Sequence, residues 1–182
     1  EYAKASPTDL LIEISISNRG PDESVIHVLP TLWFRNTWAW WPEEAKPCLK
    51  DASKRNGTVA IAAEDPLLGT YFLHCEGTAH LLFTENETNN RRLFNAENAS
   101  PYVKDAFNDL LVTGNQAVVN PAEHGTKAAA YYVSTVKPGE SMTIRLRLSS
   151  AAPSGAQILN GTFDQQIAQR RAEADEFYQT II

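Results

Sequence analysis

The feature that most constrains this chain is the clustering of its tryptophans. All four lie between Trp33 and Trp41, in a run that directly follows a predicted strand. A soluble domain rarely leaves a contiguous aromatic patch in water. The run must therefore fill a core, contact another domain or chain, or form a stacking platform for a ligand.

Hydrophobic periodicity predicts a β-rich domain. Apolar residues alternate with mostly polar ones from Leu10 to Ser17, which predicts a half-buried strand. The segment from Val25 to Phe34 is apolar on both faces and contains Pro30, so we expect a strand covered on both sides, with the proline at a bulge or an unpaired edge position. Shorter strands are predicted at 58–63, 71–75 and 79–84.

The clearest local signal is a hairpin. Strands are predicted at 128–136 and 142–148, joined by Lys137-Pro138-Gly139-Glu140. Proline followed by glycine suits the two central positions of a type II turn.

Two helices are expected. The polar section 85–98 predicts an exposed excursion from the sheet, followed by a short surface helix near 101–110 with Ser100 as N-cap. Thr162 and Gln165 form a capping box for a terminal helix. The pattern predicts a mainly β protein, an antiparallel β-sandwich over 1–150, with a linker and helix over 151–182.

Composition excludes several function classes. The net charge is −6 and there is no run of Lys and Arg, which argues against nucleic acid as a partner. No signal peptide or transmembrane run is evident, so a cytoplasmic location is expected. Cys48 and Cys75 are expected to be free thiols. Neighbours on a strand point to opposite faces, so His74, Cys75 and His80 are not expected to bind a metal.

No catalytic motif is apparent. The acidic pairs Asp105 with Asp109, Glu43 with Glu44 and Asp22 with Glu23 are expected on solvated surface, where nothing would raise a pKa for acid catalysis. The sequence therefore predicts no catalytic residue and no cofactor in this chain.

The tryptophan run has two interpretations. Trp33 and Phe34 must point to opposite faces of a strand, so they cannot share one platform, and core or domain-interface packing is favoured. For ligand stacking the better candidates are Trp38, Trp40 and Trp41, with Arg35 and Asn36 as hydrogen-bonding groups for sugar hydroxyls.

A family resemblance adds to this interpretation. The segments that carry it are Glu1–Pro7, Asn18–Pro21, Leu29–Trp38, Asn98–Asp105 and Gly125–Tyr132. They resemble the N-terminal region of bacterial proteins related to the processing α-glucosidases of glycoside hydrolase family 63, and Arg170–Tyr178 resembles the helix that leads into their next domain. The resemblance implies a sandwich of the supersandwich type that precedes an (α/α) toroid carrying both catalytic carboxylates.

Three functions follow as expectations. The first is a non-catalytic domain, part of a longer polypeptide, that packs on the toroid and shapes its substrate cleft. The second is a free-standing carbohydrate-binding module that uses the aromatic run, and the third is a self-contained enzyme. Under the first, Phe177, Tyr178, Ile181 and Ile182 have lost their partner and are expected to be exposed, disordered or buried in self-association.

Overall fold

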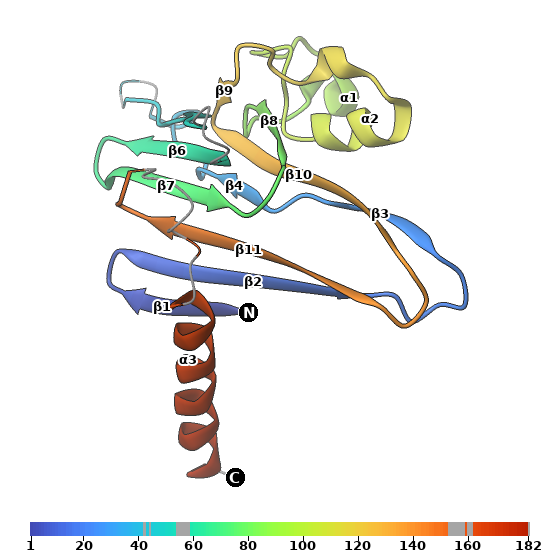
Figure 1. The fold of residues 1–182 in the computed structure, drawn as a ribbon. Helices are drawn as coiled ribbons and strands as arrows, with labels where there is room; N and C mark the ends of the chain where they lie inside the picture. Colours follow the sequence, from blue (N-terminus) through green and yellow to red (C-terminus); the bar gives the residue numbers. More distant parts are fainter. Residues whose placement is uncertain (42, 44, 54–58, 153–158, 160–161, 182) are drawn as a thin grey trace.

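The computed structural model describes residues 1–41, 43, 45–53, 59–152, 159 and 162–181. Two antiparallel sheets pack against each other, which confirms the predicted mainly β sandwich (Figure 1). The elements in chain order are β1 (Tyr2–Ser6), β2 (Asp9–Ser17), β3 (Ser24–Val28), β4 (Thr31–Trp33), β5 (Cys48–Asp51), β6 (Val59–Asp65), β7 (Gly69–Cys75), β8 (His80–Thr84), α1 (Asn90–Phe94), α2 (Ala106–Thr113), the 3₁₀ turn η1 (Gln116–Val118), β9 (His124–Gly125), β10 (Lys127–Val136), β11 (Ser141–Ser149) and α3 (Thr162–Gln179).

The larger sheet has seven strands in the order β1-β2-β11-β7-β6-β5-β9. The predicted strands at 10–17, 58–63 and 71–75 correspond to β2, β6 and β7. On the core side, Ile14 of β2 lies opposite Ile144 of β11, so the period-two pattern puts both apolar rows on one face.

The smaller sheet has four strands, with β10 at its centre between β8 and the pair β3 and β4. The predicted strand at 25–34 is interrupted at Pro30, whose carbonyl accepts a hydrogen bond from the amide of Ala130. The expectation that this strand is covered on both faces is wrong, because Val25 and Trp33 are more than half exposed. Helix α2 packs on this sheet only over β8 and the first half of β10.

The turn of the predicted hairpin is confirmed, but the pairing of its two strands is wrong. The turn forms, since the amide of Glu140 donates to the carbonyl of Lys137 at 3.0 Å and Gly139 has a φ of 75°. The two strands do not pair, however: β10 pairs with β3, β4 and β8, whereas β11 pairs with β2 and β7 in the other sheet. The turn therefore carries the chain from one sheet to the other, where each strand gains neighbours on both sides.

The core lies between the sheets and includes Leu49, Ile61, Phe83 and Leu146. Gly125 of β9 lies directly against the end of β8, because an added Cβ would lie 2.3 Å from the carbonyl oxygen of Thr84. Only glycine fits at this position, which stands next to the ends of β8 and β10.

The predicted surface helix begins later than expected. Helix α2 starts at Ala106 after Asp105, and the hydroxyl of Ser100 instead accepts a hydrogen bond from the amide of Tyr102 in a local turn. The chain from 100 to 105 is irregular because it follows the edge of the sheet: the carbonyl of Tyr102 accepts a hydrogen bond from the amide of Glu85.

The terminal helix is confirmed as α3. Its first turns pack through Phe163 and Ile167 on Ala3 and Leu11, and the rest extends away from the sandwich (Figure 1). None of the helices in the described ranges combines the length and the hydropathy needed to span a lipid bilayer. The residue before Thr162 and most of the predicted linker lie outside the described residues.

Candidate functional site

The tryptophan-bearing segment 33–41, here called the tryptophan segment, leaves the sandwich where three strand ends meet. β10 is antiparallel to both β4 and β8, so the residues after β4 and β8 lie beside those before β10. The amide of Phe34 donates to the carbonyl of Thr126 at 3.0 Å, and Nδ2 of Asn86 donates to the carbonyl of Phe34 at 2.9 Å. These two hydrogen bonds fix the start of the segment.

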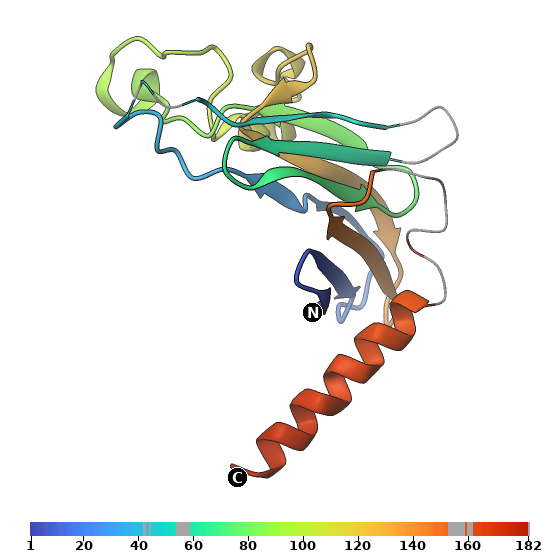
Figure 2. The same cartoon turned by 90° about the vertical axis from the view of Figure 1, so that its left-hand side faces the viewer.

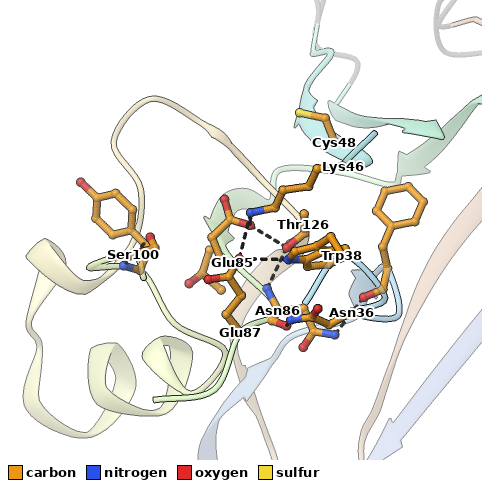
Figure 3. Close-up of polar contacts among 12 residues, drawn as sticks. Asn36, Trp38, Lys46, Cys48, Glu85, Asn86, Glu87, Ser100 and Thr126 are labelled. Atoms are coloured by element: carbon orange, nitrogen blue, oxygen red, sulfur yellow. Dashed lines mark hydrogen bonds and ion pairs between the residues drawn. The ribbon is translucent and has the colours of Figure 1, made fainter. Parts of the chain in front are cut away.

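A polar cluster of Trp38, Lys46, Glu85, Glu87 and Thr126, here called the lysine cluster, holds the rest of the segment (Figure 3). Nζ of Lys46 lies 3.0 Å from Oε2 of Glu85 and 2.9 Å from Oε1 of Glu87. The indole Nε1 of Trp38 donates to Oε1 of Glu87 at 3.1 Å, and the hydroxyl of Thr126 donates to Oε2 of Glu85 at 2.7 Å. One ammonium thus joins two carboxylates that come from the same strand end.

Electrostatics explains why the lysine is needed. The side chains of Glu85 and Glu87 are only 15% and 17% exposed, so two like charges stand close together and partly out of water. Burial would lower the pKa of Lys46, but hydrogen bonds to Glu87 and Glu85 outweigh it and raise the pKa above its ordinary value. The ammonium also lies 5.2 Å from the centre of the Trp38 ring. The cluster is therefore a charged clamp that holds Trp38 against the sandwich.

Beyond the clamp, the segment turns apolar groups outward. Trp40 and Trp41 are 61% and 46% exposed, and their rings are nearly perpendicular, at 88° and 5.7 Å between centres. The guanidinium of Arg35 lies 5.7 Å from the centre of the Trp40 ring. Leu67 and Leu68, in the turn between β6 and β7, are also strongly exposed.

A pocket of about 490 Å³ lies between this turn and the tryptophan segment, with Phe34 and Arg35 on one side and Leu67 and Leu68 on the other. The exposed residues Arg35, Trp40, Trp41, Leu67 and Leu68 are called the outer aromatic face below. Its size and position make it the strongest candidate for contact with a ligand or a partner.

The predicted site residues separate into two groups. Trp33 is exposed while Phe34 packs against the core, so the two do point to opposite faces as predicted. Asn36 is engaged within the chain, since its Nδ2 donates to the carbonyl of Asn86 at 3.0 Å and its Oδ1 accepts from the amide of Ala39 at 3.1 Å. It is not free to bind a sugar hydroxyl, in contrast to the prediction.

Sequence reasoning missed the lysine cluster and the two leucines. Glu85 and Glu87 were assigned to an exposed polar excursion, although their spacing directly after a strand places both side chains on one side of the chain. Lys46 carried no local signal because its partners are about forty positions away in the sequence.

The far end of α3 is a second exposed apolar surface. Phe177, Tyr178 and Ile181 are all more than half exposed, as expected, and the first two rings meet edge to face at 5.4 Å. Figure 2 shows the far end of α3 below the sandwich, whereas the tryptophan segment leaves the sandwich at its upper left. The role of α3 as an interdomain helix stays a prediction, and Ile182 lies outside the described residues.

The other candidates do not converge on a site. His74 and Cys75 are buried neighbours on β7, whereas His80 lies in the other sheet. In the described part of the chain, no group of three or more His, Cys, Asp or Glu residues is placed to hold a metal ion. Both cysteines are free, as expected.

The acidic pair on α2 is not simply solvated, as had been expected. Arg92 bonds to the carboxylates of Asp105 and Asp109, with 2.6 Å between Nη2 and Oδ2 of Asp109. The hydrogen bond from Arg92 lowers the pKa of Asp109. A lowered pKa at Asp109 is the opposite of what a general acid needs.

Comparison with known proteins identifies an uncharacterized relative of this chain. No model of a known protein family matches the sequence. The chain is 34% identical over 211 aligned positions to an uncharacterized protein of Saccharomyces cerevisiae, YMR196W. The similarity covers 97% of this chain but 19% of the yeast protein, so the chain spans about a fifth of that relative's length.

Proposed function

We propose that this chain is a non-catalytic β-sandwich domain of a glycoside hydrolase of the α-glucosidase type, which packs on an (α/α) toroid catalytic domain and shapes its substrate cleft. The observation that carries the proposal is the outer aromatic face, which is exposed on this domain beyond the clamped Trp38. The matched region makes up 19% of the yeast relative, which therefore contains further polypeptide that such a face would contact.

The composition of the face favours a protein partner. Tryptophan and arginine are enriched where protein interfaces bind most strongly, and a pocket beside them can receive a side chain of the partner. Because the rings of Trp40 and Trp41 are perpendicular, they offer no single plane on which a sugar ring would stack. The indole N–H of Trp38 is already bonded to Glu87.

The chemistry of the site supports placing catalysis elsewhere. Glu85 and Glu87 form the carboxylate pair of the site, and both are bound to the Lys46 ammonium. A glycosidase needs one carboxyl group that carries a proton and a second that faces it across a cleft. Here the Lys46 ammonium lies between the two carboxylates, so they do not enclose a space in which a sugar could bind.

The test is to produce this chain and the polypeptide encoded after it separately, and then to mix them. We expect a stable complex by sedimentation, and hydrolysis of p-nitrophenyl α-glucoside only by the mixture. Trp40→Ala combined with Trp41→Ala should weaken the complex, whereas Phe94→Ala, which changes an exposed aromatic of α1, should not. Equal binding by both variants, or hydrolysis by this chain alone, would contradict the proposal.

The second candidate is a free-standing carbohydrate-binding module, and the exposure of Trp40 and Trp41 is the observation that favours it. All four tryptophans belong to one segment, so tryptophan fluorescence reports on this segment alone. Saturable quenching by glucose oligomers that is lost in Trp40→Ala and kept in Phe177→Ala would favour this module over the docking domain.

A further inference from the structure

A second recess lies on the outer face of the smaller sheet, between β8 and the segment formed by α2 and η1. Its volume is about 740 Å³, within the range of small-molecule sites. None of the described residues that line it belongs to the tryptophan segment. It is a separate feature, and its interpretation does not rest on the proposed docking function.

The floor of this groove is apolar and rigid. Leu82 and Leu110 are buried in the packing of α2 on the sheet, and Tyr131 lies beside them, half-buried. The hydroxyl of Tyr131 lies 2.7 Å from Nδ1 of His27, and the two rings stack with 5.8 Å between centres and 16° between planes. The tyrosine ring is therefore held in place and offers a fixed aromatic surface to the groove.

The rim is polar, and its side chains are free. His80, Gln116 and Glu123 come from three separate segments, and all three are exposed. Their side chains have no hydrogen-bond or ion-pair partner among the described residues. An imidazole, an amide and a carboxylate together supply both donors and acceptors around an apolar floor.

A turn with an unusual backbone conformation places Glu123 at this rim. Its φ is 55°, in the left-handed region that residues other than glycine rarely adopt. The turn is braced by Asn120, whose side-chain amide donates to the carbonyl of His124 at 2.7 Å and whose carbonyl accepts from the amide of Glu123 at 3.2 Å.

The charges of the groove select the class of ligand. No lysine or arginine is among the described residues that line it, and a carboxylate stands at its rim, so anions are disfavoured. A ring compound with C–H faces and hydroxyl edges matches an apolar floor with a polar rim. We infer that this groove binds a neutral, hydroxyl-rich ring compound, a small sugar or a cyclic polyol, with its C–H face on Tyr131 and Leu110 and its hydroxyls at His80, Gln116 and Glu123.

Isothermal titration calorimetry of the chain tests this inference with glucose, galactose, maltose, cellobiose and myo-inositol, and with glucose 6-phosphate as the anionic probe. We expect saturable binding of at least one neutral probe and weaker binding of the phosphate. His80→Ala should weaken binding about tenfold because it removes a hydrogen bond to the ligand. Glu123→Gln should also weaken binding, because it replaces a charged acceptor of hydroxyl hydrogen bonds with a neutral amide. Trp40→Ala should leave binding unchanged.

His80→Ala and Glu123→Gln change exposed side chains that have no hydrogen-bond or ion-pair partner among the described residues, so their thermal unfolding should match that of the parent chain. Three outcomes would overturn the inference: no saturable binding of any neutral probe at millimolar concentration, tighter binding of the phosphate, or binding that His80→Ala keeps and Trp40→Ala abolishes. The last outcome would assign sugar binding to the outer aromatic face and would also weaken the proposed docking function. The first would leave the docking function intact.

Discussion

Replacing Lys46 by methionine should destabilise the fold more than the loss of an ordinary surface lysine. The side chain of Lys46 is 40% exposed, so its two ion pairs are screened and contribute about 0.5 kcal/mol each. The larger effect comes from Glu85 and Glu87, which would remain mostly buried without a counter-charge, at a cost of about 1 to 2 kcal/mol. We expect the free energy of unfolding to fall by about 2 to 3 kcal/mol.

The assay is urea unfolding followed both by circular dichroism and by tryptophan fluorescence, which reports only on the tryptophan segment. The native emission should shift to the red because Trp38 loses its clamp. Lys50→Met is the matched control. Lys50 pairs with Glu64 and both side chains are well exposed, so this substitution should leave the free energy of unfolding nearly unchanged.

A double-mutant cycle with Glu87→Gln separates the clamp from other effects. Lys46→Met should cost at least about 1 kcal/mol less in the Glu87→Gln background, because only one carboxylate is then left unpaired. The reasoning is refuted if the two substitutions add without coupling, or if Lys46→Met behaves like Lys50→Met and leaves the emission unchanged.

Three more predictions concern the sandwich. Gly125→Ala should lower the free energy of unfolding by about 2 kcal/mol or more in thermal unfolding, because the new Cβ meets the Thr84 carbonyl; an unchanged melting temperature would contradict this. Burial lowers the pKa of His74, whose Nδ1 is buried without a hydrogen-bond partner among the described residues. The free energy of unfolding should therefore be highest above the ordinary pKa of 6.5 and should fall as the pH drops below that value. The same acid sensitivity in His74→Gln would refute this role. Burial raises the pKa of Cys75 to about 12. A thiol reagent at neutral pH should therefore label Cys48 in the native protein and Cys75 only after unfolding. Labelling of Cys75 in the native protein, detected by mass spectrometry, would contradict this prediction.

The sequence predicted the parts of the fold that have a local cause. The alternation from Leu10 to Ser17, the Pro138-Gly139 turn and the start of a helix at Thr162 each depend on residues within a few positions of one another. The break at Pro30 was also foreseen, because proline cannot donate to a ladder wherever the strand lies. In the candidate site, Trp38, Trp40 and Trp41 were named as stacking candidates because they lie beyond the strand end. Trp40 and Trp41 are exposed, whereas Trp38 is bonded to Glu87.

Tertiary structure alone decided which elements meet. The same turn at 137–140 would serve a hairpin or a crossing between sheets, and the pairing of β11 with β2 rather than with β10 depends on contacts more than a hundred positions apart. The lysine cluster and the groove at His80 have the same origin, since each gathers side chains from distant segments at one end or face of the smaller sheet. Local periodicity indicates which face of a strand is apolar, but it does not indicate which strand or helix will cover that face. The choice of the covering element is set by the packing free energy of the whole chain.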